Sequence, residues 1–414
     1  MKKLIGPFKQ IVTLANLPLR GKLDDSQLEI VENGGILISE NLIEKIGDFK
    51  DLKIDLENSN DTFELHLIET EQICLPAFVD AHTHICFGGN RANDFAMRNG
   101  GKTYLQIAES GGGIWSSVLH TREASQEELL ETLLERINSL LKLGITTIEI
   151  KSGYGLDVEN ELKMLRVIQQ AQIQTKATLI PTCLSAHLKP RDFEGGNKEY
   201  LEYIIKEILP IVAKENLAKR VDIFIEKSAF LEEESRDYLL KAKELGFEIT
   251  VHADQFTPGS SRIAVEVGAK SADHLEASTD EDIVYLANSD TVAIALPGAS
   301  LGLGEPFTPA RKILDNNGIL AIASDWNPGS APMGNLLVQA SILATFQKLS
   351  TAEVLSAITF RAAHALNLSD RGILQKGKKA DFVTFETDNF QNILYKQGSL
   401  LAKNIFIDAD IQKF

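Results

Sequence analysis

Short apolar runs alternate with longer amphipathic segments along most of this chain. Eight runs have the length and composition of buried strands: Phe78–His84, Ile145–Lys151, Thr178–Leu184, Val221–Glu226, Glu248–Ala253, Ser271–His274, Val292–Leu296 and Leu320–Asp325. The segments between them repeat apolar residues at intervals of three and four, which predicts helices over Glu127–Leu143, Glu159–Ala171, Glu199–Ala213 and Glu232–Leu245. Strands that alternate with helices in this way indicate a parallel sheet, and eight repeats favour a (β/α)8 barrel over an open doubly wound sheet.

The two ends of the chain have a different pattern. Short extended runs bounded by Gly, Asn and Asp predict hairpin strands at Gly35–Ile38, Phe63–Ile68, Asp381–Glu386 and Ile405–Asp408. We therefore expect an α/β protein in which residues 76–369 form a TIM-like barrel. Residues 1–75 and 370–414 would together form a small, discontinuous β-sandwich domain.

The amino-acid composition limits the kinds of partner that this protein is expected to bind. The 414 residues are 44% hydrophobic and 24% charged, which is ordinary for a globular protein, and the formal net charge is -16. An excess of negative charge repels phosphate backbones and anionic lipid, so neither nucleic acid nor a membrane is an expected partner. The first residues contain no continuous apolar segment of the signal-peptide type. Three cysteines, Cys74, Cys86 and Cys183, lack CxxC spacing, and we expect them to be buried free thiols in a cytoplasmic protein.

The first predicted barrel strand ends in two histidines separated by one residue. Side chains at i and i+2 of a strand point to the same face, so His82 and His84 could converge on one metal ion. By itself the pattern also fits two polar residues that end a strand.

Three further candidate ligands fall at the carboxyl ends of other predicted strands. These are His252, His274 and Asp325. Active sites of β/α barrels are built at this rim, so we expect these side chains to meet the histidine pair there. Imidazoles combined with a carboxylate suit zinc or iron better than they suit magnesium or calcium.

Longer motifs give these residues a family resemblance. The spacing of the five candidate ligands, together with GILQKGKKADFV near the carboxyl end, resembles the amidohydrolase superfamily of metal-dependent hydrolases. Between about Pro76 and Phe390 the chain is most similar to the imidazolonepropionase family. The motifs that carry this similarity are HTHICFGGNRANDF, ESGGGIWSSV, EIKSGYGLD, VHADQF, SADHLE, LPGASLGLGE and SDWNPGSAP. SGYG combined with DWNPGS distinguishes this family from dihydroorotases, hydantoinases and purine deaminases.

The resemblance implies a set of roles. One zinc or iron ion would be held by His82, His84, His252 and Asp325, and it would activate water for attack on the ring carbonyl of 4-imidazolone-5-propanoate. The product would be N-formimidoyl-L-glutamate, in the third step of histidine degradation, and the protein would be a homodimer. Asp325 and His274 would transfer protons and stabilise the oxyanion. Substrate contacts would come from Arg91, Tyr104, Tyr154, His187, Gln255, Asn327, Gly329 and Ser330.

Gln255 stands where the resemblance suggests both substrate contact and catalysis. An amide can orient a substrate group but cannot act as a general base, so proton transfer falls to Asp325 and His274.

Alternatives remain at this point. The chain could be another cyclic amidohydrolase, a deaminase on the same barrel, or a scaffold without catalysis. Lys227, just after the fourth predicted strand, keeps open a two-metal site with a carbamylated lysine. Arg91 could simply pair with Asp94 at the surface, and Gly111–Gly113 could be either a plain flexible loop or a mobile lid.

Overall fold

The computed structural model describes residues 1–413, with all of their side chains except those of Tyr104, Leu105 and Ala108. The predicted substrate contact of the Tyr104 side chain therefore lies outside the described residues.

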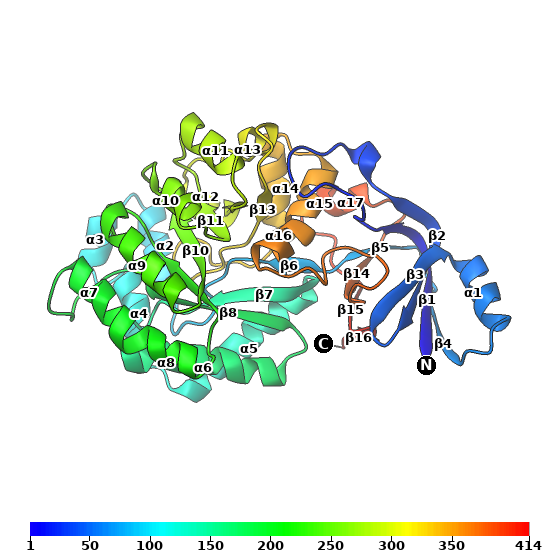
Figure 1. Cartoon of the computed structure of the whole chain (residues 1–414), viewed down its shortest axis with the longest axis horizontal. Coiled ribbons are helices and arrows are strands. Elements are labelled where there is room, and N and C mark those ends of the chain that lie inside the picture. Colours follow the sequence, from blue (N-terminus) through cyan, green and yellow to red (C-terminus); the bar gives the residue numbers. More distant parts are fainter. Residues whose placement is uncertain (414) are drawn as a thin grey trace.

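Eight parallel strands form the central barrel (Figure 1). In chain order they are β6 (Phe78–Asp80), β7 (Ile145–Lys151), β8 (Thr178–Ala186), β9 (Arg220–Ile223), β10 (Glu248–Ala253), β11 (Ser271–His274), β12 (Val292–Ala295) and β13 (Leu320–Ile322). Beyond the last strand, the N–H of His84 donates to the carbonyl of Trp326, and the N–H of Asp325 donates to the carbonyl of His82. These bonds join the first strand to the eighth at the rim, and the predicted barrel is confirmed.

Helices cover the outside of the barrel and connect its strands. They are α2 (Ala92–Asn99), α3 (Tyr104–Glu109), α4 (Ile114–Glu123), α5 (Gln126–Lys142), α6 (Val158–Gln174), α7 (Asn197–Tyr203), the π-helical turn η2 (Ile204–Ile208), α8 (Leu209–Lys214), α9 (Glu232–Glu244), α10 (Ser260–Glu266), α11 (Asp280–Ala287), α12 (Pro297–Leu303), α13 (Ala310–Asp315), α14 (Leu336–Gln347), α15 (Thr351–Ala357) and α16 (Phe360–Ala365). The strands are covered on both faces, as in β7, where every residue is buried. This explains why the strands were recognisable as continuous apolar runs.

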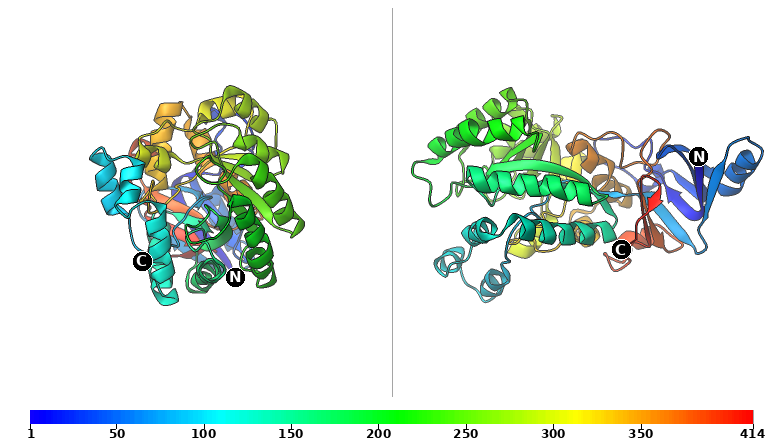
Figure 2. Two further views of the ribbon diagram at one scale, coloured as in Figure 1. Left: turned by 90° about the vertical axis from the view of Figure 1, so that its left-hand side faces the viewer. Right: turned by 90° about the horizontal axis from the view of Figure 1, so that it is seen from below.

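Strands from the two ends of the chain form a second sheet beside the barrel. They are β1 (Lys2–Val12), β2 (Ile30–Ser39), β3 (Leu42–Asp48), β4 (Phe63–Leu67), β5 (Gln72–Pro76), β14 (Phe382–Glu386), β15 (Asn404–Ile407) and β16 (Asp410–Ile411). The N-terminal strands, in blue, lie side by side with the C-terminal strands, in red, at one end of the molecule (Figure 2). Three helices accompany them: η1 (Asp25–Gln27), α1 (Phe49–Glu57) and α17 (Gln391–Tyr395).

This terminal sheet is one hydrogen-bonded sheet that branches and curls. β1 pairs with β2 on one edge and with both β4 and β5 on the other. The N–H of Ile43 in β3 donates to the carbonyl of Lys378, so the far edge of the sheet returns towards β14. The curled sheet encloses its own apolar core, in which Phe382 and Phe406 stack with ring centroids 4.3 Å apart. The sheet thereby joins both ends of the chain beside the barrel.

Four strands, β6, β9, β12 and β13, end earlier than their sequence patterns suggested. β6 ends at Asp80 and β13 ends at Ile322, so His82, His84 and Asp325 all lie just beyond strand ends. The segment around Thr83 nevertheless stays extended, because Thr83 forms an isolated parallel bridge with Trp326. The alternation of side chains that the histidine pair requires is therefore preserved outside the strand.

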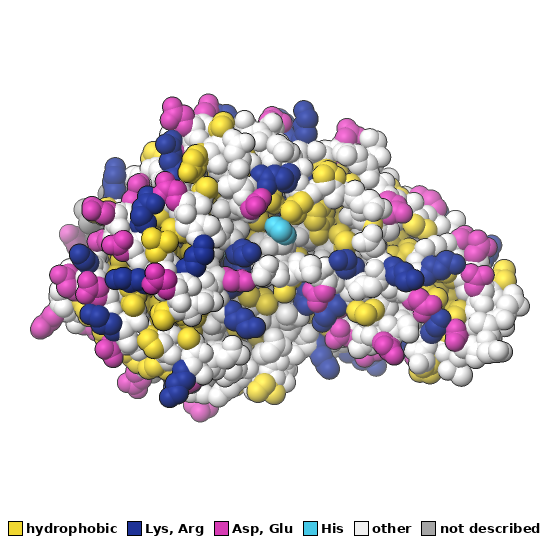
Figure 3. All heavy atoms as spheres, in the orientation of Figure 1, with side chains coloured by type: hydrophobic (Ala, Val, Ile, Leu, Met, Phe, Trp, Pro, Cys, Tyr) yellow, Lys and Arg dark blue, Asp and Glu magenta, His cyan; other side chains and the backbone are white. Residues whose placement is uncertain are grey.

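The surface charges and the burial of the cysteines are as the composition led us to expect. On the face shown in Figure 3, Lys and Arg side chains are interspersed with Asp and Glu side chains. The three cysteines are buried and free, as expected. Among the described residues, no helix combines the length and the apolar character that crossing a membrane requires.

Candidate metal centre and substrate cavity

Three histidines from two strand ends meet at the rim of the barrel. The Nε2 atom of His84 lies 3.2 Å from Nε2 of His82 and 3.2 Å from Nε2 of His252. One ligand atom from each of the three residues falls within 4.8 Å of the others, and all three side chains are buried. The rims of β6 and β10 thus place these imidazoles around one point.

The opposite ring nitrogens of two of these histidines face buried carboxylates. Nδ1 of His82 lies 2.7 Å from Oδ2 of Asp273, and Nδ1 of His252 lies 2.9 Å from Oδ2 of Asp222. A carboxylate opposite Nδ1 favours the tautomer that carries its proton on Nδ1, which leaves the Nε2 lone pair directed at the common point. Burial is the main cause that lowers the pKa of His82, of His84 and of His252 below the ordinary value, so the rings are neutral.

Asp325 supplies a carboxylate to the same point. Its Oδ1 lies 3.5 Å from Nε2 of His82 and 3.5 Å from Nε2 of His84. The backbone of Asp325 has φ 51°, a left-handed conformation that is unfavourable for a residue other than glycine. Burial raises the pKa of Asp325 to about 7.

The donor set fits a divalent metal ion. Three neutral imidazole lone pairs and a carboxylate converge within a buried space, where they would repel one another without a cation between them. Two of the imidazoles are oriented by carboxylates, which is the usual arrangement behind histidines that bind metals. The three histidines and Asp325 therefore have the donor chemistry and the convergence that a divalent ion requires.

His274, the fourth rim histidine, lies beside this centre and outside the three-histidine cluster. Its backbone has φ 85°, also in the left-handed region, and its Nδ1 lies 3.5 Å from Oε2 of Glu276. Although burial opposes the shift, the carboxylate of Glu276 raises the pKa of His274 above its ordinary value. The side chain faces the cavity above the metal centre together with Asp325.

A cavity of about 530 Å³ opens over the metal centre. The predicted contact residues whose side chains are described all line it: Arg91, Tyr154, His187, Gln255, Asn327, Gly329 and Ser330. They come from loops that follow different barrel strands, so the fold alone brings them together.

An ion pair with Asp94, the alternative that the sequence left open for Arg91, holds Arg91 at the cavity wall. Its Nε lies 2.7 Å from Oδ2 of Asp94, and the same oxygen accepts the N–H of Gly113 at 2.8 Å. The terminal nitrogens of the guanidinium are not used by Asp94 and remain available for a ligand. Any side chain at Gly329 would collide with Nη1 of Arg91, so the glycine makes room for the guanidinium.

The turn after β13 is built around the side chain of Asn327. Its amide donates to the carbonyl of Asp325 at 2.7 Å and to Oγ of Ser330 at 2.9 Å. Its oxygen accepts the N–H groups of Gly329 and Ser330, each at 2.8 Å. The amide is therefore fully engaged in shaping the turn that carries Asp325 and Ser330.

Glu161 holds the loop that carries Tyr154. Its buried carboxylate accepts the N–H groups of Gly153, Gly155 and Leu156 at 3.1, 2.8 and 2.9 Å. Tyr154 is 3% exposed, and burial raises the pKa of its hydroxyl well above the ordinary value. Tyr154 is therefore a neutral hydrogen-bonding group in the cavity wall.

The structure adds residues that the sequence motifs did not single out. Arg98 and Lys102 also line the cavity, and like Arg91 they come from the segment between β6 and α3. Asp222, Asp273 and Lys151 lie behind the metal centre. Charged residues inside otherwise apolar parallel strands were the signal that could have identified these last three.

Lys227 does not join the metal centre. Its side chain is exposed and is not among the residues that line the cavity. The described residues thus give no support to a site with two metals bridged by this lysine.

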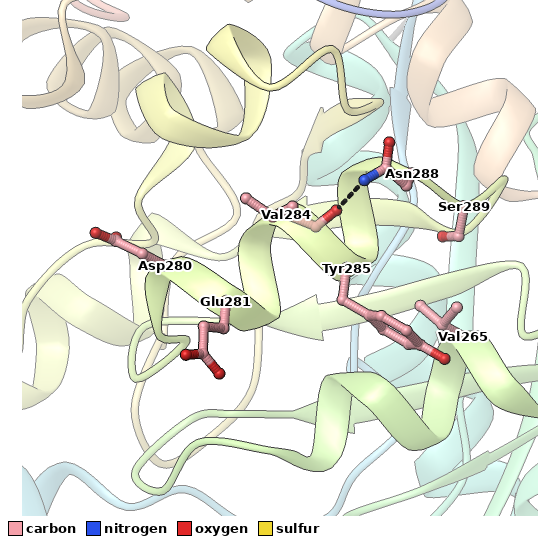
Figure 4. Close-up of a pocket in the computed structure, with 7 residues that line it drawn as sticks. All are labelled: Val265, Asp280, Glu281, Val284, Tyr285, Asn288 and Ser289. Carbon is pink, nitrogen blue, oxygen red and sulfur yellow. Dashed lines mark hydrogen bonds between the residues drawn. The ribbon is translucent and has the colours of Figure 1, made fainter.

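A separate surface hollow lies over α10 and α11, where Asn288 donates to the carbonyl of Val284 (Figure 4). The residues that line it are Val265, Asp280, Glu281, Val284, Tyr285, Asn288 and Ser289. None of them lines the cavity over the metal centre.

The chain is similar to known proteins in sequence and in fold. The sequence model of the amidohydrolase family matches residues 73–412. Imidazolonepropionase of Clostridium tetani is 37% identical over 416 residues, which span 99% of each chain. Imidazolonepropionase of Bacillus cytotoxicus is 40% identical over 375 residues, covering 90% of this chain and 87% of that protein. The crystal structure of atrazine chlorohydrolase from Arthrobacter aurescens complexed with zinc has a TM-score of 0.71 at 16% identity, covering 99% of this chain and 94% of that one.

Proposed function

Because the chain belongs to the amidohydrolase family and, within it, to the imidazolonepropionases, we propose that it hydrolyses 4-imidazolone-5-propanoate to N-formimidoyl-L-glutamate. This reaction is the third step of histidine degradation. The observation that carries the proposal is one cavity in which the metal ligands and the free guanidinium nitrogens of Arg91 face the same space. That combination suits a small cyclic amide with a carboxylate side chain.

One metal ion per chain, zinc or iron, would be held by His82, His84, His252 and Asp325. When bound, such an ion lowers the pKa of a water molecule and polarises a carbonyl oxygen. Neutral imidazoles and a carboxylate are suitable ligands for either metal.

Arg91 would bind the propanoate carboxylate of the substrate. Its Nε is occupied by Asp94, so the two terminal nitrogens form the recognition surface. His187 would accept a ring N–H, because its own Nδ1 donates to the carbonyl of Gly153 at 3.0 Å and leaves Nε2 as an acceptor. Tyr154 would donate from the adjacent wall, and Tyr104 remains a predicted contact.

Asp325 and His274 would handle the protons of the reaction. As water adds to the ring carbonyl carbon, the Asp325 carboxylate accepts the proton that the water loses. His274 donates a hydrogen bond to the developing oxyanion. The bond between this carbon and the ring nitrogen then breaks, and the proton passes from Asp325 to the departing nitrogen. Gln255 would orient the ring, since its amide cannot accept a proton at neutral pH.

The turn after β13 would contact the part of the substrate that becomes the glutamate moiety. Since the amide of Asn327 is engaged in the turn, we assign contact mainly to Gly329 and Ser330 and a shaping role to Asn327. We further propose residues 76–369 as the catalytic domain and residues 1–75 with 370–414 as the small β domain. A homodimer in the cytoplasm is the state that we expect.

The test uses freshly generated imidazolonepropionate, whose loss is followed by ultraviolet absorbance in the presence of metal-loaded protein. We expect accelerated loss together with one equivalent of formimidoylglutamate and no release of ammonia. Loss at the uncatalysed rate would contradict the proposal. Ammonia released from an aminopurine would instead indicate a deaminase on this barrel.

A further inference from the structure

Lys151, the last residue of β7, is buried behind the metal centre among three carboxylates. Its Nζ lies 2.8 Å from Oε1 of Glu149, 2.9 Å from Oδ2 of Asp222 and 3.8 Å from Oδ2 of Asp273. The side chain is 0% exposed, and a charge removed from water in this way is retained only when it is closely paired. Although burial opposes the shift, Asp222 and Glu149 raise the pKa of Lys151 above its ordinary value, so the ammonium stays charged.

Two of these carboxylates are the ones that orient the metal-binding histidines. Oδ2 of Asp222 faces Nδ1 of His252, and Oδ2 of Asp273 faces Nδ1 of His82. In each aspartate the oxygen nearest the imidazole is the same oxygen that faces Lys151. The ammonium is therefore separated from each of two metal ligands by a single carboxylate oxygen.

Glu149, the third carboxylate, connects this network to Thr83, the residue between His82 and His84. Oε2 of Glu149 accepts the N–H of Thr83 at 3.3 Å, and Oγ1 of Thr83 donates to the carbonyl of Glu149 at 2.6 Å. The N–H of Lys151 donates to the carbonyl of Thr83 at 2.9 Å. Both the backbone and the side chain of Lys151 thus act on the segment that presents the histidine pair.

The positive charge of Lys151 counteracts the repulsion between these carboxylates. Three carboxylates packed behind the histidines would repel one another at low dielectric, and the two aspartates would move apart. An ammonium between them holds their oxygens in place, whereas a neutral side chain of the same length would only fill the space.

We propose that Lys151 is a positioning residue for the metal centre, fixing Asp222 and Asp273 so that the Nε2 atoms of His252 and His82 converge on one ion. The proposal rests on the proposed function, because it takes that ion to be bound by the three histidines and Asp325. It assigns Lys151 no contact with substrate or metal.

The principal variant is Lys151→Met, which keeps the length of the side chain and removes its charge. The matched control is Lys163→Met. Lys163 is half-buried, and its ammonium donates to the backbone carbonyls of Thr121, Arg122 and Ala124, outside the centre. Both variants are purified without metal, and their zinc affinity is measured by competition with a chromophoric chelator. Thermal unfolding of the metal-free proteins reports any general loss of stability.

We expect Lys151→Met to bind zinc about 10–100-fold more weakly, the range typical of lost support behind metal ligands. The visible spectrum of the cobalt-substituted variant should also change, because the histidines no longer converge in the same geometry. Lys163→Met should keep the wild-type affinity and spectrum even if its unfolding temperature falls.

A folded Lys151→Met protein with wild-type zinc affinity and cobalt spectrum would overturn the proposal and leave Lys151 a purely structural residue. If that variant does not fold, Lys151→Gln is measured in the same way and judged by the same outcomes. Neither measurement involves imidazolonepropionate. Failure of the hydrolysis assay would therefore overturn the proposed function without deciding the role of Lys151.

Discussion

The imidazole of His187 stacks on that of His84, with ring centroids 5.4 Å apart and ring planes inclined by 25°. One ring belongs to the metal centre and the other to the wall of the substrate cavity. Burial lowers the pKa of His187 to about 3, so its ring is neutral in the whole neutral range of pH. A substrate ring that stacks on these imidazoles would therefore lie directly beside the proposed metal ligands.

His187→Phe should keep the stacking surface and remove the acceptor nitrogen. We expect KM to rise about tenfold, as for loss of one buried hydrogen bond, with unchanged metal content. Because His187 is neutral at these pH values, the pH profile of kcat should keep its shape. Steady-state kinetics checks this against His364→Phe, which replaces an exposed histidine outside the cavity. An unchanged KM in His187→Phe would remove His187 from the substrate contacts.

Arg91→Lys should weaken substrate binding although it conserves charge. A lysine cannot pair with Asp94 and present two parallel donors to a carboxylate at the same time. We expect kcat/KM to fall about 10–100-fold, mainly through KM. Arg166→Lys is the control, because Arg166 pairs through Nε and Nη2 with Glu215 at the surface and does not line the cavity. Equal behaviour of the two variants would exclude Arg91 from carboxylate recognition.

Asp325→Asn should nearly abolish hydrolysis while the barrel remains folded. The amide can neither accept the proton from water nor pass it to the leaving nitrogen, and we expect kcat to fall about 10²–10⁴-fold. Asp290→Asn, at a fully exposed aspartate, should behave as wild type. Circular dichroism and metal analysis accompany the kinetics, and wild-type turnover in a metal-loaded Asp325→Asn protein would refute the assignment.

Removal of the metal should stop hydrolysis and leave the fold in place. The barrel and its cores are assembled from apolar residues, whereas the proposed ligands are four side chains at the rim, His82, His84, His252 and Asp325. We expect dialysis against a chelator to abolish activity and lower the thermal unfolding temperature, with unchanged far-ultraviolet circular dichroism. Zinc or iron should restore activity at one ion per chain. Two ions per chain at full activity would contradict the single centre.

Glu161→Gln should lower stability and weaken substrate binding, although Glu161 does not line the cavity. The N–H groups of Gly153, Gly155 and Leu156 all bond to Oε1, and a neutral amide oxygen in its place would accept them less strongly than the carboxylate does. We expect the free energy of unfolding to fall by about 2 kcal/mol, and KM to rise because the loop carries Tyr154. Urea unfolding checks the first effect. Glu159→Gln, an exposed position on the same helix, should change neither quantity.

Periodicity alone determined the architecture of this protein. The eight apolar runs correspond to β6–β13, and the four amphipathic segments correspond to α5, α6, the α7–α8 region and α9. These elements were predictable because strands covered on both faces must be apolar throughout, and helices covered on one face must be amphipathic. Strand ends were less predictable, since β6 ends before His82 where hydrogen bonds from neighbouring loops replace the ladder.

The motifs also indicated candidate ligands, since His82, His84, His252 and Asp325 stand at strand ends that a barrel must bring to one rim. Only the tertiary structure decided which charged side chains pair with one another behind these candidate ligands. Lys151, Asp222 and Asp273 belong to different strands, and their pairing depends on the register of those strands around the barrel. A sequence records which side chains are charged, but the energy of a buried charge is set by partners far away along the chain.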